Sequence, residues 1–82
     1  MDEVGKVFTY FSKVCVAGIK ITCGSLKVGD KIRIQGHTTS IEQVIDSIQI
    51  DSDAVQEASA GQSVGIKVPD RVRPNDVVYK LD

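Results

Sequence analysis

The sequence contains very few aromatic residues. Tryptophan is absent, and Phe, Tyr and Trp together make up 5% of the 82 residues. Without large rings the core has to be filled by Val and Ile, whose branched side chains favour strands over helices. A chain of this length buries only roughly 60% of the surface that its unfolded form exposes. We therefore expect one small domain over residues 1–82, with its core between about 5 and 81 and little room for an enclosed active-site cleft.

Long apolar runs and an excess of either charge are also lacking. No apolar stretch approaches the ~20 residues that span a bilayer, and Met1-Asp2-Glu3 lacks the charged-then-apolar layout of a signal peptide. We therefore expect a cytoplasmic protein without membrane contact. Ten basic and 11 acidic residues give a net charge of −1. This balance argues against DNA as a partner and lowers the expectation for nucleic acid in general, but it leaves room for a local basic patch.

Residues that bind metals or carry redox chemistry are scarce. The spacing of Cys15 and Cys23 matches neither a C-x-x-C motif nor a paired metal site, and His37 has no partner at a short offset. The two cysteines share the parity of Ala17, Ile19 and Ile21, so a continuous strand would turn both thiols inward as small core residues. We expect no metal, no cofactor and a turn position for His37.

Catalytic motifs are missing as well. No G-x-x-x-x-G-K-[ST] phosphate loop occurs, so we expect no GTP binding by this chain alone, and no G-x-S-x-G or H-E-x-x-H occurs either. Asp51-Ser52-Asp53 begins like a calcium loop, but Gln56 and Gln62 stand where glycine and glutamate are required. These observations predict a protein that is not an enzyme and has no catalytic residues.

A turn followed by an alternating strand dominates what is present. Gly24 and Gly29 suit the positive φ angles of tight turns, and after Asp30 the apolar Ile32 and Ile34 alternate with polar residues. Gly18 lies within another β-rich run, which indicates a bulge or a close backbone approach. Periodicity and turn residues predict strands over 5–12, 14–22, 31–36, 41–50, 63–68 and 77–81.

The segment Ile41–Ile50 is ambiguous. Ile41, Val44, Ile45 and Ile48 have the i, i+3, i+4, i+7 spacing of a helix. The high content of β-branched residues and the lack of another apolar layer for a helix to pack on favour a strand. Residues 51–61 are predicted to be irregular, with at most one helical turn around 55–58. Together these features predict an all-β fold, a small six-stranded antiparallel β-barrel.

Charge is distributed unevenly along the chain. Residues 1–40 carry a net charge of +3 and residues 41–82 a net charge of −4. Lys20, Lys31 and Arg33 occupy outward positions of strands that we expect to be adjacent, which gives a small basic stripe able to meet phosphates. An ordinary solvated sheet face explains the same pattern. Arg71 and Arg73 form a second basic group in the loop bracketed by two prolines.

Several blocks, in order, resemble the second, β-barrel domain of translational GTPases of the elongation factor Tu type. They cover the chain from Gly5 to Leu81 and are Gly24-x-Leu26-Lys27-Val28-Gly29-Asp30-Lys31-Ile32, Val44-Ile45-x-Ser47-Ile48-Gln49, Ala58-x-Ala60-Gly61-Gln62-x-Val64-Gly65-Ile66 and Asn75-Asp76-Val77-Val78. A closer resemblance is to the small C-terminal barrel of U32-type peptidase-like proteins. It is carried by Gly5-Lys6-Val7-x-x-Tyr10-Phe11-Ser12-Lys13 and Gly36-His37-Thr38-Thr39.

The resemblance implies a binding role. In the elongation factors this barrel touches ribosomal RNA or the aminoacyl end of tRNA, with a glutamate where Gln49 stands here. We therefore expect a non-enzymatic module for RNA (tRNA or rRNA) or a translation-related protein. The expected contacts are Lys20, Lys31, Arg33, Arg71 and Arg73. The alternative is an accessory subunit that supplies in trans, through a protein interface, the barrel that a peptidase-like protein or a GTPase carries in cis.

Overall fold

A computed structural model describes residues 2–51 and 53–81, and within these ranges it contains strands and no helix. All strand pairs are antiparallel. The all-β antiparallel prediction is confirmed. The strands are β1 (Asp2–Phe11), β2 (Val16–Ile21), β3 (Ser25–Lys27), β4 (Lys31–Gln35), β5 (Ser40–Val44), β6 (Ile48–Ile50), β7 (Asp53–Val55), β8 (Glu57–Ser59), β9 (Ser63–Lys67) and β10 (Val77–Leu81).

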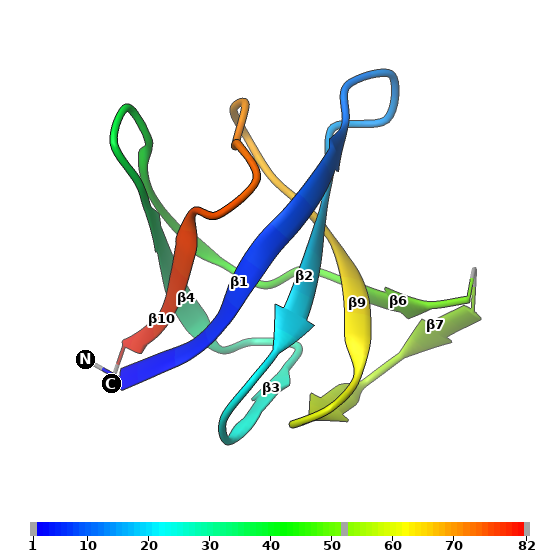
Figure 1. Ribbon diagram of the computed structural model, residues 1–82. Helices are drawn as coiled ribbons and strands as arrows, with labels where there is room; N and C mark the ends of the chain where they lie inside the picture. Colours follow the sequence, from blue (N-terminus) through cyan, green and yellow to red (C-terminus); the bar gives the residue numbers. More distant parts are fainter. Residues whose placement is uncertain (1, 52, 82) are drawn as a thin grey trace.

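Eight strands form one sheet in the order β5-β4-β10-β1-β2-β9-β6-β7, and β3 and β8 form a separate two-stranded sheet. Figure 1 shows the large sheet curling round the core, with β1 in its middle and the two ends of the chain side by side. Among the described residues, the edge strands β5 and β7 are not paired with each other. The prediction of a six-stranded closed barrel is therefore wrong in strand number and in closure.

The core is built from the inward faces of these strands. The alternation expected on β2, β4 and β9 is confirmed, because every second residue of each strand is buried while its neighbours face outward. Burying one such side chain contributes about 1.5 to 3 kcal/mol. The side chains that are almost wholly buried are Val7, Ile19, Ile21, Leu26, Ile32, Ile34, Ile45, Ile48, Ile66, Val72 and Val78.

The ambiguous segment is two strands and not one. β5 ends at Val44 and β6 begins at Ile48. Between them Ile45 leaves the ladder: its amide donates to the Asp30 carbonyl at 2.9 Å, and its side chain is 1% exposed. This break changes the parity, so that Ile45 and Ile48 both point inward. The i, i+3, i+4, i+7 spacing in the sequence therefore arises from the break between β5 and β6 and not from a helix.

The segment after β6 also differs from its prediction. β7 and β8 replace the irregular connection with its helical turn, and β3, which no periodicity indicated, pairs with β8. Leu26 and Ala58 face each other in this pairing and are both buried. Strands of three residues are too short to show the alternation that identifies longer ones.

Both cysteines are exposed, so the prediction of buried thiols is wrong. β2 spans only Val16–Ile21, and neither cysteine belongs to it. Cys15 lies in the preceding turn with a φ of 56°, and Cys23 follows the end of the strand. Parity with Ala17, Ile19 and Ile21 therefore carries no information about the two thiols.

The turn before β4 is formed as expected. Gly24 and Gly29 have φ angles of 72° and 98°, which glycine adopts at little cost. The Asp30 carboxylate accepts a hydrogen bond from the Lys27 amide at 3.1 Å and lies 3.4 Å from the Lys80 ammonium. These contacts fix the entry of β4 against β10.

The I34D substitution should abolish folding. Ile34 is 0% exposed, and an unpaired carboxylate there costs more than about 3 kcal/mol, a large part of the stability of a domain of this size. The exposed neighbour supplies the control, because Q35D should change the free energy of unfolding by less than about 0.5 kcal/mol. Circular dichroism with urea titration measures both. A folded I34D variant would contradict the assigned core.

Candidate functional site

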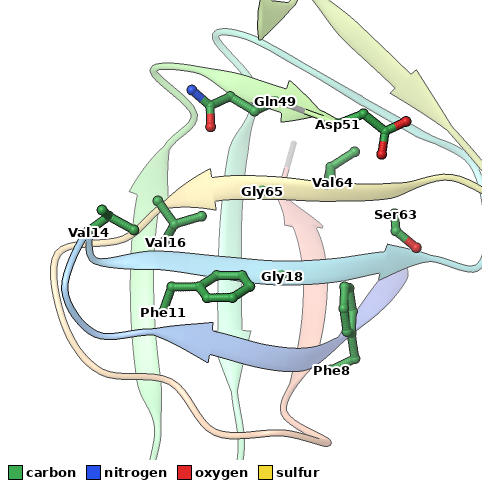
Figure 2. Close-up of a pocket in the computed structure, with 10 residues that line it drawn as sticks. All are labelled: Phe8, Phe11, Val14, Val16, Gly18, Gln49, Asp51, Ser63, Val64 and Gly65. Carbon is green, nitrogen blue, oxygen red and sulfur yellow. The ribbon is translucent and has the colours of Figure 1, made fainter. Parts of the chain in front are cut away.

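The outer face of the large sheet carries a hollow of about 430 Å³ over β1, β2, β9 and β6. Figure 2 shows its walls, with phenylalanines of β1 on one side and polar residues of β6 on the other. We call it the outer-face hollow. It is lined by Phe8, Phe11, Val14, Val16, Gly18, Gln49, Asp51, Ser63, Val64 and Gly65.

The floor of the hollow is glycine backbone, which is buried at Gly18 and half-buried at Gly65. Gly18 of β2 lies directly opposite Gly65 of β9 in the ladder. A Cβ atom at Gly18 would lie 2.6 Å from Thr9 Cγ2 and 3.0 Å from Phe8 Cζ, so the site has no room for a side chain. The register of β1 against β2 shifts between Val7 and Thr9. The bulge or close approach expected at Gly18 is therefore confirmed, with the extra residue, Phe8, on the facing strand.

The aromatic wall comes from this bulge. Phe8 and Phe11 are 52% and 53% exposed, and Val14 is 58% exposed. Apolar side chains gathered on one exposed patch are typical of a surface that meets a partner. The sequence analysis did not single out these residues, because a phenylalanine in an alternating strand is ordinarily a core residue. Alternation with the exposed Lys6 and the buried Val7 places Phe8 outside, and the register shift brings Phe11 to the same outer face.

The opposite wall is polar. Gln49 and Asp51 lie on and just after β6, across the glycine floor from the phenylalanines (Figure 2). The Gln49 amide offers both a donor and an acceptor, whereas the Asp51 carboxylate only accepts. Gln49 is the position at which the resemblance placed a glutamate in the elongation factors. It lines the outer-face hollow.

Lysines border the floor at both ends. Lys6 and Lys20 face each other on β1 and β2, one outward position beyond Gly18. Lys67 of β9 lies opposite Val16, one outward position beyond the floor in the other direction. All three are exposed. Lys6 and Lys67 were not among the predicted contacts, because only the strand order reveals them as neighbours of Lys20.

The predicted stripe is divided by the strand order. Lys20 lies on β2, whereas Lys31 and Arg33 lie on β4, and β1 and β10 run between them. The assumption that these residues occupy adjacent strands is therefore wrong. Arg33 Nε lies 3.9 Å from a carboxylate oxygen of Glu42 on β5. A role for these three residues in RNA binding stays a prediction.

Arg71 and Arg73 are exposed on the loop between β9 and β10, where they line a separate pocket beside Tyr10. Partial burial raises the pKa of the Tyr10 hydroxyl above its usual value. The Cys15 thiol raises this pKa further, and the Arg71 guanidinium lowers it. The hydroxyl is therefore protonated near neutral pH and can donate a hydrogen bond.

Other kinds of site are not formed by the part of the chain that the structure describes. Residues 2–51 and 53–81 contain no group of three or more His, Cys, Asp or Glu side chains placed to hold a metal ion. His37 is exposed in the turn before β5, as predicted. None of the described residues belongs to a helix that is long and apolar enough to cross a membrane.

Comparison with known families identifies the fold. Residues 15–70 match the family of elongation factor Tu domain 2. The chain belongs to this family. The match covers β2 to β9, which include the glycine floor and the polar wall of the hollow.

Relatives with the names of peptidases match almost the whole chain. A collagenase of Porphyromonas gingivalis is 41% identical over 80 residues, which are 96% of this chain and 22% of the collagenase. An uncharacterized protease of Methanocaldococcus jannaschii is 42% identical over 96% of this chain and 19% of its own length. The chain thus spans about a fifth of the length of the curated relatives it matches.

Solved structures show the same fold. The C-terminal domain of a Geobacillus thermoleovorans protein assigned to the U32 peptidases superposes with a TM-score of 0.90 at 21% identity, over 99% of this chain and 93% of that one. Its selenomethionine variant gives a TM-score of 0.91 at 22% identity, over 98% of this chain and 100% of that one. Both resemblances predicted from the sequence are confirmed.

The prediction that the protein is not an enzyme is overturned by these relatives. Those that match over 96% of the chain are named collagenase and protease, so the chain is related to a peptidase family. The motif search missed this relation because it examined 82 residues, about a fifth of the length of such relatives.

The G18A substitution should displace Phe8 and lower stability by about 1 to 3 kcal/mol, because the new methyl group overpacks against Thr9 and the Phe8 ring. T9S removes the methyl group that lies 2.6 Å from the added Cβ. The T9S/G18A double variant should therefore recover part of the loss, as a double-mutant cycle in urea measures. A G18A variant as stable as the wild type would contradict the close approach at Gly18. Strictly additive losses of stability from T9S and G18A would contradict it as well.

Proposed function

We propose that the chain is the RNA-binding domain of a protein of the U32 peptidase type, and that the outer-face hollow holds single-stranded RNA. The observation that carries this proposal is a glycine floor, half-buried at Gly65, that is walled by two half-exposed phenylalanines and bordered by lysines at both ends. Aromatic faces stack on unpaired bases, and lysines meet the backbone that joins them.

The floor supports RNA as the ligand because its two glycines carry no side chains. Thr9 and Phe8 lie over Gly18, whereas Gly65 beside it is half-buried. A planar ring can therefore approach the sheet backbone at Gly65, with Phe8 and Phe11 on the β1 side. Each base stacked on an aromatic ring contributes about 1 to 3 kcal/mol.

The spacing of the lysines also supports RNA as the ligand. Successive outward residues of a strand are about 6.8 Å apart, so Lys20 and Lys67 lie in rows on either side of the floor. A base on the floor thus has a cation on each side for the phosphates that flank it. The three lysines outnumber the one carboxylate that lines the hollow, Asp51, so the local charge is positive although the net charge of the chain is −1.

A second candidate is an extended peptide. The hollow presents mostly apolar side chains, and the relatives named collagenase and protease act on polypeptides by name. In that case the domain supplies a peptide-docking surface for the peptidase part, in cis or as an accessory subunit in trans. Apolar pockets between strands give such surfaces their specificity.

Fluorescence anisotropy with a labelled single-stranded RNA of mixed sequence tests the proposal. F8A and F11A should each weaken binding at least about fivefold, the equivalent of 1 kcal/mol of stacking. Lys6, Lys20 and Lys67 together should give a slope of roughly −2 in log K against log[salt], and K20A should reduce its magnitude by about 0.7.

Two controls separate the outer-face hollow from other surfaces. V44A removes an exposed apolar residue of β5, and K31A removes an exposed lysine of β4. Both should leave RNA affinity unchanged. Binding that depends on Lys31 but not on Phe8 would move the site to β4 and contradict the proposal. Binding of a labelled apolar peptide without any binding of RNA would replace it with the second candidate.

A further inference from the structure

A second pocket lies near the end of β1. It has a volume of about 300 Å³ and is formed between β1 and the loop that joins β9 to β10. We call it the arginine pocket. Its lining residues are Thr9, Tyr10, Arg71, Val72, Arg73 and Pro74. It presents two guanidinium groups, a phenol and a threonine hydroxyl, all of which can donate hydrogen bonds.

The loop holds both arginines outward. Val72 between them is 1% exposed, so its side chain anchors the loop in the core while Arg71 and Arg73 remain exposed on either side. In an extended segment such alternate residues project to the same side, about 6.8 Å apart. The two guanidinium groups therefore reach the same pocket from neighbouring positions.

Backbone hydrogen bonds fix this arrangement. The Asn75 amide donates to the Val7 carbonyl at 2.8 Å, and the Arg73 amide donates to Asp76 Oδ2 at 2.9 Å. Asp76 itself is 5% exposed, so its carboxylate is committed to the loop and faces inward. These hydrogen bonds hold the backbone that carries the two arginines, so this backbone loses little conformational entropy when the pocket binds a ligand.

Charge in the pocket is positive. Among residues 2–51 and 53–81, no carboxylate lies within 4.0 Å of the guanidinium of Arg71 or Arg73. Asp70 is the acidic neighbour, and its Oδ1 accepts a hydrogen bond from the Arg71 amide at 2.8 Å. Burial and the Cys15 thiol raise the pKa of the Tyr10 hydroxyl, which keeps its proton near neutral pH, so Tyr10 adds no negative charge to this pocket.

The two sites adjoin at Thr9. This residue lines the arginine pocket, and its Cγ2 borders the position above Gly18 in the outer-face hollow. A chain that leaves the glycine floor across the β1 bulge reaches the arginines directly. Paired guanidinium groups bind phosphate oxygens by charge-assisted, often bidentate hydrogen bonds.

We infer that Arg71, Arg73, Tyr10 and Thr9 form a binding site for a phosphate group, and that this group belongs to the backbone of the RNA strand whose base lies on the glycine floor. The inference rests on the proposed function for the identity of the strand. The site itself rests on the loop geometry alone. A free phosphate offers the same oxygens, so the experiment includes it as a separate probe.

The experiment combines RNA anisotropy with NMR of the Tyr10 ring. The R71A/R73A variant should reduce the magnitude of the salt slope for RNA by about 1.4, at 0.7 for each lost contact. R73K keeps the charge but loses the bidentate fork, so it should weaken binding while preserving the slope. K27A, which removes an exposed lysine of β3, should change neither. Inorganic phosphate should shift the Tyr10 ring signals of the wild type and not those of R71A/R73A.

The outcomes separate this inference from the proposed function. If RNA binding depends on Phe8 but its salt slope is unchanged in R71A/R73A, the arginine pocket is overturned and the outer-face hollow remains supported as the RNA site. A phosphate-induced shift of Tyr10 without RNA binding supports the pocket with a free phosphate as its ligand and overturns the RNA strand. If the wild type and R71A/R73A are both folded and the wild type binds neither RNA nor inorganic phosphate, both assignments are overturned.

Discussion

The antiparallel pairing of β1 with β2 is the constraint on which the rest of the structure depends. β1 lies in the middle of the large sheet, and its register against β2 shifts between Val7 and Thr9. Phe8 follows the buried Val7 and lies over Gly18, where any side chain would collide with Thr9, and the shift brings Phe11 to the same outer face. It also leaves Val7 buried as part of the core. One bulge thus supplies the aromatic wall and keeps the inner face apolar.

Both proposed sites lie along the same strand. The outer-face hollow contacts β1 at Phe8 and Phe11, and the arginine pocket contacts it at Thr9 and Tyr10. The pairing of Asp2 with Lys80 places the start of β1 and the end of β10 together, at the opposite end of the strand (Figure 1). The relatives named as peptidases match this chain over about a fifth of their length. The two proposed sites lie along the side of β1, away from the end at which Asp2 pairs with Lys80.

The sequence predicted the parts of the fold that alternation governs. Ile32 and Ile34 are buried as expected, and so are Val64 and Ile66, because five-residue strands show a clear period of two. It did not predict β3, β7 and β8, which are too short to show one. Of the site, Gly18 was identified by its position in a strand. The aromatic wall was not, because a register shift between two paired strands, which neither sequence shows alone, brings Phe11 to the same outer face as Phe8.

The central claim is that the glycine floor between the phenylalanines and Gln49 is where a strand of RNA binds. The most direct measurement is a ¹H–¹⁵N spectrum of the labelled chain during titration with a short single-stranded RNA. The account predicts that the largest shift changes fall on the amides of Gly18, Gly65 and the residues around Phe8, and that β4 and β5 change little. Changes centred on Lys31 and Arg33, or none at a saturating RNA concentration, would contradict it.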